Sequence, residues 1–193
     1  MPKSPDIEID MGIEADMRRW LERAVIGLNL CPFAKAVHVK GQIHCAVSQA
    51  TQASELLEDL KKELKDLVAL DPSTRDTTLL IAPWCLQEFL DFNDFLAQAG
   101  KVLTGQGLEG IVQIASFHPQ FQFAGTDADD ITNFTNRAPY PTLHLLREDS
   151  IDRAVQAFPQ AADIFEKNMQ TLTQLGAEGW TALDVGPRGK MGL

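Results

Sequence analysis

The stretch TTLLIA, residues 77–82, is a short continuous run of apolar and β-branched residues. A run of this kind, without polar alternation, is typical of a β-strand that is covered on both faces. Helical periodicity flanks it on both sides, with leucines on one face of residues 53–69 and phenylalanines and leucines on one face of residues 83–103. Pro72 ends the first of these helices, because proline cannot continue it. This helix–strand–helix pattern predicts an α/β protein.

Three further strands are predicted, and they set the topology of the sheet. They are QIHCAVS (42–48), IVQIASF (111–117) and TLHLLR (142–147). Long helical segments separate the first three strands, which indicates right-handed crossovers and parallel pairing. The fourth strand follows a long loop with little helical pattern, so we expect it to be antiparallel. The predicted fold is a single α/β domain with a mixed four-stranded sheet, three parallel strands plus one antiparallel, packed with helices.

The chain of 193 residues is predicted to fold as one domain over residues 12–183. Residues 1–11 carry two prolines and no periodicity, so we expect a flexible N-terminal arm. Residues 184–193 are rich in glycine, which predicts a flexible C-terminal tail.

The composition limits the classes of partner. The formal net charge of -10 opposes binding to nucleic-acid phosphates and to anionic membranes. No apolar run approaches the roughly 18 residues of a membrane span, and the N-terminus has no hydrophobic signal segment. Three cysteines without a paired framework fit reduced thiols. We therefore expect a cytoplasmic protein that binds a small molecule or another protein, without nucleic acid or membrane, and self-association into a homo-oligomer stays open.

The connection HPQFQFAGTDADDITNFTNRAPYP, residues 118–141, is the most informative segment for function. Loops of this length are uncommon in compact domains and are often functional. Aromatic residues give the segment apolar anchors, namely Phe121, Phe123, Phe134 and Tyr140. Because ligands of open α/β sheets bind where the carboxyl ends of the strands meet, we expect an ordered lid over a pocket at that edge. The alternative is a loop that only fills the open end of the sheet.

His118 and Arg137 are the strongest candidates for chemistry in this segment. His118 ends the third predicted strand and would serve as a general base near neutral pH; the alternative is a hydrogen-bonded structural histidine. Arg137 suits a bidentate clamp on a carboxylate or phosphate, which predicts an anionic small-molecule ligand. It would instead pair within its own loop if an aspartate of the DADD run (127–130) lies beside it.

Further ligand contacts are predicted around this pocket, at Asn136, Trp84, Tyr140 and His144. Each has a structural alternative: a turn cap for Asn136, a core position for Trp84, an apolar anchor for Tyr140 and a buried hydrogen-bonded ring for His144. No CxxC, HxxxH or HExxH spacing is present, so we expect no metal site. No cofactor is predicted.

The stretch GLNLCPFAKAVH, residues 27–38, places a thiol in a tight bend. Its CPFA tetrapeptide resembles the active-site start of glutaredoxins and of omega-class glutathione transferases, which makes Cys31 a candidate nucleophile. In those folds the cysteine follows a strand, whereas here an amphipathic helix from Glu14 to about Leu30 precedes it. Pro32 ends that helix, and a helix C-terminus disfavours a thiolate. A packed structural cysteine is therefore the alternative.

Separated motifs across the chain carry a wider resemblance. They are AVIGLNLCPFAKAV, LLIAPW, FHPQFQF and NRAPYPTLHLLRE. Together they resemble the bacterial domain-of-unknown-function family 1415, over roughly residues 12–183. The resemblance implies a single-domain bacterial protein and supplies no activity and no catalytic residue.

The functional hypothesis that the sequence favours is an enzyme acting on a small anionic metabolite in a pocket under the 118–141 loop. In this hypothesis His118 and Cys31 are catalytic, and Arg137 orients the ligand. The alternative is a non-catalytic domain that binds a small molecule or another protein.

Overall fold

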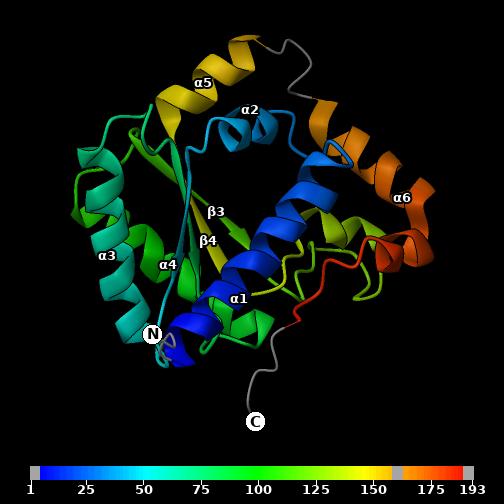
Figure 1. Ribbon diagram of the computed structural model, residues 1–193, viewed down its shortest axis with the longest axis horizontal. Coiled ribbons are helices and arrows are strands. Elements are labelled where there is room, and N and C mark those ends of the chain that lie inside the picture. Colours follow the sequence, from blue (N-terminus) through cyan, green and yellow to red (C-terminus); the bar gives the residue numbers. More distant parts are fainter. Residues whose placement is uncertain (1–4, 158–162, 189–193) are drawn as a thin grey trace.

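The computed structural model describes residues 5–157 and 163–188 and contains one mixed sheet with helices on both faces (Figure 1). Its strands are β1 (Ile43–Val47), β2 (Thr77–Ile81), β3 (Val112–Phe117) and β4 (Thr142–Arg147), in the order β1-β2-β4-β3. β1 pairs parallel with β2, and β4 pairs antiparallel with both β2 and β3. The predicted mixed α/β sheet of four strands and the antiparallel fourth strand are confirmed.

The prediction of three parallel strands was wrong, because β4 lies between β2 and β3. Only β1 and β2 form a parallel pair. The central strand β4 buries Leu143 and Leu145 on one face and Thr142 on the other, whereas β3 exposes Gln113. A strand that is covered on both faces suits the middle of a sheet, and a partly polar strand suits its edge. Since β4 is antiparallel to both neighbours, β1, β2 and β3 still end at one common edge.

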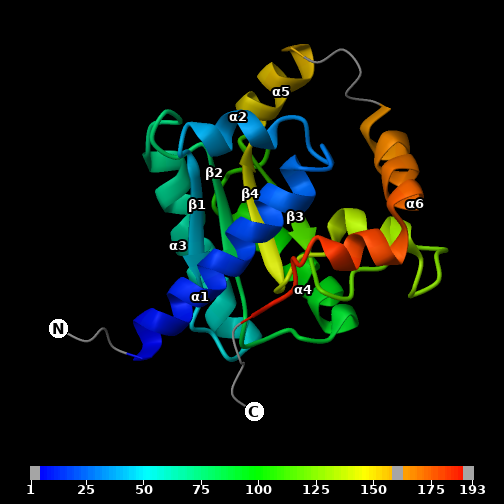
Figure 2. The ribbon, with the colours of Figure 1, turned by 45° about the vertical axis from the view of Figure 1, so that its right-hand side comes forward.

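The helices form one layer on each face of the sheet. They are α1 (Pro5–Trp20), α2 (Ala34–Val39), α3 (Ala53–Ala69), α4 (Phe89–Gly105), α5 (Glu148–Ala157) and α6 (Ile164–Ala182), with a π-helical segment η1 (Leu21–Ile26) and a 3-10 segment η2 (Ile131–Asn136). α3 and α4 cover one face; α1 and α2 lie on the other, with α6 beyond them (Figures 1 and 2). α5 projects from the end of the sheet where β4 ends (Figure 2).

β2 separates two hydrophobic cores, and all of its residues are buried, as its unbroken apolar run predicts. Leu80 belongs to the core with α3 and α4, whereas Leu79 and Ile81 belong to the core under α1. α3 contributes the predicted row of fully buried leucines, Leu56, Leu60, Leu64 and Leu67. Burying one leucine side chain contributes about 1.5–3 kcal/mol, so this row dominates the attachment of α3 to the sheet.

Both termini carry contacts or helical structure that the sequence pattern did not indicate. α1 begins at Pro5, so residues 5–11 of the predicted arm are helical. Residues 184–188 of the predicted tail lie against α1, where Arg19 donates to their carbonyl oxygens and the N–H of Arg188 donates to Asp16. The remaining parts of the arm and the tail, residues 1–4 and 189–193, lie outside the described residues.

Candidate functional site

His118 follows β3 at the carboxyl edge of the sheet, as predicted, and its side chain is fully buried. Its Nδ1 accepts the N–H of Gln120 at 3.0 Å, which assigns the ring proton to Nε2. Nε2–H then donates to the carbonyl oxygen of Leu86 at 3.1 Å. Phe89 and Phe92 pack against the ring at centroid distances of 5.5 and 5.1 Å. Burial lowers the pKa of His118, and both ring nitrogens are occupied. These are the contacts of a structural histidine.

Arg137 forms hydrogen bonds to other residues of its own loop, residues 118–141. Its Nε donates to the carbonyl oxygen of Phe121 at 3.1 Å, and its Nη2 donates to that of Ala128 at 2.5 Å. The guanidinium carbon lies 4.3 Å from the centroid of the Phe134 ring, a cation–π contact. Burial lowers the pKa of Arg137. The guanidinium partners are thus loop carbonyls and an aromatic ring, and the DADD aspartates are not among them.

Asn136 and Tyr140 tie the same loop to neighbouring elements. Asn136 donates from Nδ2 to the carbonyl oxygen of Ser116 at 3.2 Å, and the backbone carbonyl oxygen of Asn136 accepts the N–H of His118 at 3.1 Å. The Tyr140 hydroxyl donates to Oδ2 of Asp16 at 2.8 Å, and both side chains are buried. Burial, together with the Asp16 carboxylate, raises the pKa of Tyr140 far above its ordinary value. The loop is therefore an ordered and internally bonded structure.

Trp84 and His144 belong to the side of the sheet that α1 covers. Trp84 is partly buried and packs against the α1 core. The Thr77 hydroxyl donates to the carbonyl oxygen of Leu145 at 2.7 Å, so its oxygen accepts the His144 Nε2–H at 2.7 Å. Burial lowers the pKa of His144 to about 4. His144 is therefore neutral near pH 7 and bonded inside the fold.

Cys31 and His118 lie toward opposite ends of the sheet. It stands on the turn between η1 and α2, toward the end of the sheet where β1 begins, whereas His118 follows the end of β3 (Figure 1). Burial raises the pKa of Cys31, although N–H groups of Phe33 and Ala34 act in the opposite direction. The structure thus places the two predicted catalytic residues toward opposite ends of the sheet, and it does not favour a thiolate at Cys31.

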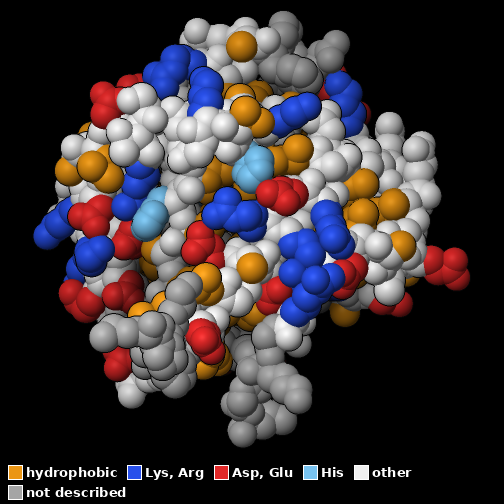
Figure 3. Space-filling model, in the orientation of Figure 1, with side chains coloured by type: hydrophobic (Ala, Val, Ile, Leu, Met, Phe, Trp, Pro, Cys, Tyr) orange, Lys and Arg blue, Asp and Glu red, His pale blue; other side chains and the backbone are white. Residues whose placement is uncertain are grey.

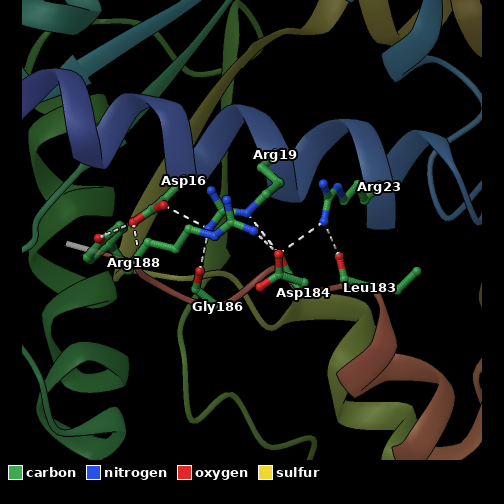
Figure 4. Close-up of polar contacts among 8 residues, drawn as sticks. Asp16, Arg19, Arg23, Leu183, Asp184, Gly186 and Arg188 are labelled. Atoms are coloured by element: carbon green, nitrogen blue, oxygen red, sulfur yellow. Dashed lines mark hydrogen bonds and ion pairs between the residues drawn. The ribbon is translucent and has the colours of Figure 1, made fainter.

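A buried aspartate that the sequence did not single out connects α1 to the C-terminal segment (Figure 4). Asp16 is 2% exposed, and its carboxylate accepts Arg19 Nη2 at 2.8 Å and the N–H of Arg188 at 2.8 Å, besides the Tyr140 hydroxyl. A buried carboxylate is stable only when it is paired and hydrogen-bonded. The partners of Asp16 meet that requirement.

Arg19 of α1 and Arg23 of η1, one helical turn apart, bond to the backbone of residues 183–186. Arg19 donates to the carbonyl oxygens of Asp184 at 2.8 Å and Gly186 at 2.6 Å, and Arg23 donates to that of Leu183 at 2.9 Å (Figure 4). Figure 3 shows basic side chains gathered over α1 and the adjoining C-terminal segment. Arg19 and Arg23 each donate to the C-terminal segment, so this basic surface attaches that segment to the N-terminal helix.

An open groove of about 810 Å³ lies between α3 and α4. Its apolar lining is made by Leu57 and Val68 of α3 and by Val102 and Leu108 of α4 and the turn after it. Val68 is 36% exposed, so part of this apolar surface faces solvent. None of the predicted site residues lines this groove, and none lines three smaller hollows on the described surface.

Lysines surround the apolar lining of this groove, which we call the α3–α4 groove. They are Lys61, Lys65 and Lys101. Lys61 lies 2.6 Å from the Glu58 carboxylate, and both side chains are exposed. Within residues 5–157 and 163–188, neither Lys65 nor Lys101 has an ion-pair partner. In a chain of net charge -10 this is a local positive rim around an apolar surface. The signal in the sequence is Lys61 and Lys65 at i, i+4 on one helix, a spacing that is also typical of a solvated face.

The described residues contain no group of three His, Cys, Asp or Glu side chains that could hold a metal ion. Over the same residues, no helix combines the length and the apolar character needed to cross a membrane.

These features define a mixed α/β domain built on one four-stranded sheet, with a lysine-rimmed apolar groove on one helical layer. The family model described as "Protein of unknown function (DUF1415)" matches residues 12–182. The chain therefore belongs to this family, and the resemblance found in the sequence is confirmed. Comparison with curated proteins and with solved structures gave no match.

Proposed function

We propose that this protein is a non-catalytic interaction domain whose α3–α4 groove binds an acidic amphipathic helix of a protein partner. The observation that carries the proposal is the combination of an apolar lining with two lysines, Lys65 and Lys101, that lack an ion-pair partner among the described residues. Amphipathic helices commonly bind by laying their apolar face into such a groove. Carboxylates along the sides of the helix would then meet the lysine rim.

The contacts at the carboxyl edge do not support the enzyme that the sequence favoured. A general base needs a ring nitrogen that reaches substrate, and both nitrogens of His118 already bond to Leu86 and Gln120. A ligand clamp needs a guanidinium that faces the ligand, and Arg137 uses its Nε and one Nη2 donor on carbonyls of its own loop. An enzyme acting on a small anionic metabolite stays a prediction; the anionic partner is retained here, at a different site.

The test is a binding titration with a fluorescent acidic amphipathic peptide of about five helical turns. The peptide should bind the wild-type chain, and the triple variant Lys61→Glu, Lys65→Glu, Lys101→Glu should bind at least about tenfold more weakly, because attraction becomes repulsion at each position. The matched control is Lys35→Glu, Lys40→Glu, Lys167→Glu, which makes the same change in net charge away from the groove. Its affinity should stay within about twofold of the wild-type value.

Several results would overturn the proposal. The first is a peptide that does not bind the wild-type chain at low salt, where charge attraction is strongest. The second is an equal loss of affinity in the two triple variants, which would mean that only net charge matters. The third is binding of dodecanoate to the groove without binding of the peptide, which would make the site one for a small anionic amphiphile.

A further inference from the structure

α5 is a helix with no buried residue. Helices shorter than about 12–15 residues are marginal in water without packing, and α5 covers only Glu148–Ala157. Figures 1 and 2 show it projecting from the end of the sheet, beyond α2. Ile151, Ala154 and Val155 share one helical face by their i, i+3, i+4 spacing, and Val155 is 43% exposed. Ile151 and Ala154 are half-buried, so the described residues cover this apolar face only in part.

The first turn of α5 is fixed in position. The N–H of Glu148 donates to the carbonyl oxygen of Ile111 at 3.0 Å, and the Ser150 hydroxyl donates to Asp76 Oδ1 at 2.6 Å. These bonds anchor the helix to the segments that lead into β3 and β2. These hydrogen bonds fix the direction in which α5 projects from the end of the sheet.

The charges of α5 complement those of the α3–α4 groove. α5 carries Glu148, Asp149 and Asp152, and no ion pair joins any of them to another described residue. Its one basic side chain, Arg153, donates to the Ser150 hydroxyl at 2.8 Å. The described residues therefore present an acidic amphipathic helix and a lysine-rimmed apolar groove, whose opposite charges are mostly unpaired among them.

Both surfaces lie toward the same end of the sheet. β4 is antiparallel to its neighbours, so α5 leaves from the end where β1, β2 and β3 begin. α3 and α4 return to that end, and the groove extends to their C-terminal ends, from Leu57 to Val68 of α3 and from Gln98 to Gly105 of α4. The lengths also agree: the α3 lining from Leu57 to Val68 spans about 16 Å, and α5 spans about 15 Å.

From this complementarity we infer that two copies of the chain exchange their α5 helices, each seating α5 in the α3–α4 groove of the other. The inference rests on the proposed function of the groove and names its partner. A reciprocal exchange closes with two-fold symmetry, so neither surface is left open for further association. It also covers the apolar face of α5, which gives a short helix the packing that it otherwise lacks.

The experiment is sedimentation velocity of the full chain over a range of concentrations, with charge-reversed variants. The wild-type chain should form a dimer. The groove variant (Lys61→Glu, Lys65→Glu, Lys101→Glu) and the α5 variant (Glu148→Lys, Asp149→Lys, Asp152→Lys) should each dimerise at least about tenfold more weakly. The control variant Lys35→Glu, Lys40→Glu, Lys167→Glu should dimerise like the wild type. Circular dichroism checks that every variant is folded.

Restored pairing is the decisive result. A chain carrying all six reversals should dimerise again, and an equimolar mixture of the groove and α5 variants should form the mixed dimer, because both contacts regain opposite charges. A wild-type chain that stays monomeric while the acidic peptide still binds the groove overturns this inference alone. Absence of peptide binding at a chain concentration where sedimentation finds only the monomer, so that the groove is vacant, overturns the proposed function. A dimer that neither charge reversal weakens also rules out the α5 exchange.

Discussion

The carboxyl edge of the sheet and the α3–α4 groove differ in how their polar side chains are used. At the edge, His118, Arg137 and Tyr140 each bond to a partner inside the fold. In the groove, Lys65 and Lys101 have no ion-pair partner in the described part of the chain. From the sequence alone, the carboxyl edge is the favoured functional site and the groove is not. The reason is that residue types able to perform chemistry are visible in a sequence, whereas their bonding partners are not.

This difference has an energetic consequence. Removing one partner of a buried hydrogen bond leaves the other unsatisfied, which costs about 1–3 kcal/mol. An exposed lysine contributes a few tenths of a kcal/mol at most. Substitutions at the carboxyl edge should therefore lower the free energy of unfolding, whereas substitutions in the groove should change binding.

The largest effect is expected at His118. His118→Ala should lower the free energy of unfolding by about 3 kcal/mol, since it leaves a cavity between Phe89 and Phe92 and strips the Leu86 carbonyl of its donor. Urea denaturation at pH 7 measures the change. Gln113→Ala, at an exposed position of β3, is the control and should change stability little. A variant as stable as the wild type would show that the His118 ring does not stabilise the fold, and the contrast between the carboxyl edge and the groove would not hold.

A pH effect of about 2 kcal/mol is expected from His144. Its folded pKa is about 4, whereas an unperturbed histidine titrates near 6.5. Between these values the unfolded state binds more protons, so the stability from this group is complete above about pH 6.5 and falls as the pH approaches 4. His144→Gln should therefore lose about 2 kcal/mol less than the wild type between pH 7 and pH 5, measured by urea denaturation. Equal losses would mean that the buried ring does not titrate as its environment requires.

Arg137 should have a somewhat smaller effect, confined to its loop. Arg137→Ala should cost about 1–2 kcal/mol and speed amide hydrogen exchange across residues 118–141, because two carbonyl bonds and the contact with Phe134 are lost. Arg137→Lys retains the charge but cannot make both carbonyl bonds, so its stability and exchange rates should lie between those of the wild type and Arg137→Ala. Unchanged stability and exchange in Arg137→Ala would return this guanidinium to the role of a ligand clamp.

Local pattern sufficed for much of the fold. The unbroken run of β2, the leucine row of α3 and the strand at residues 142–147 all agree with the structure to within a residue. The order of the strands did not follow from these patterns. Placing β4 between β2 and β3 depends on comparing the burial of both faces of strands that lie far apart in the sequence, and the lengths of the connections do not determine it.

The candidate site was harder to predict for a related reason. His118 is recognisable as a residue at the carboxyl edge, but its acceptor is the carbonyl of Leu86, a non-glycine residue with φ of 55° in the turn before α4. Nothing in the local pattern around either residue indicates that bond. The groove has the opposite difficulty: Lys61 and Lys65 are visible as an i, i+4 pair, and only the neighbouring helix makes them the rim of a binding surface.

The smallest stability effect is expected for the groove variant Lys61→Glu, Lys65→Glu, Lys101→Glu. Its free energy of unfolding should equal that of the control Lys35→Glu, Lys40→Glu, Lys167→Glu to within about 0.5 kcal/mol, because both add the same negative charge and the Lys61–Glu58 pair is exposed. Urea denaturation of both proteins at the same salt concentration measures the difference. Comparing the two variants removes the general repulsion that six units of added negative charge create in an already acidic chain. If the groove variant were clearly less stable than its control, the lysines would be part of the fold, as His118 and Arg137 are, and the contrast between the two regions would disappear.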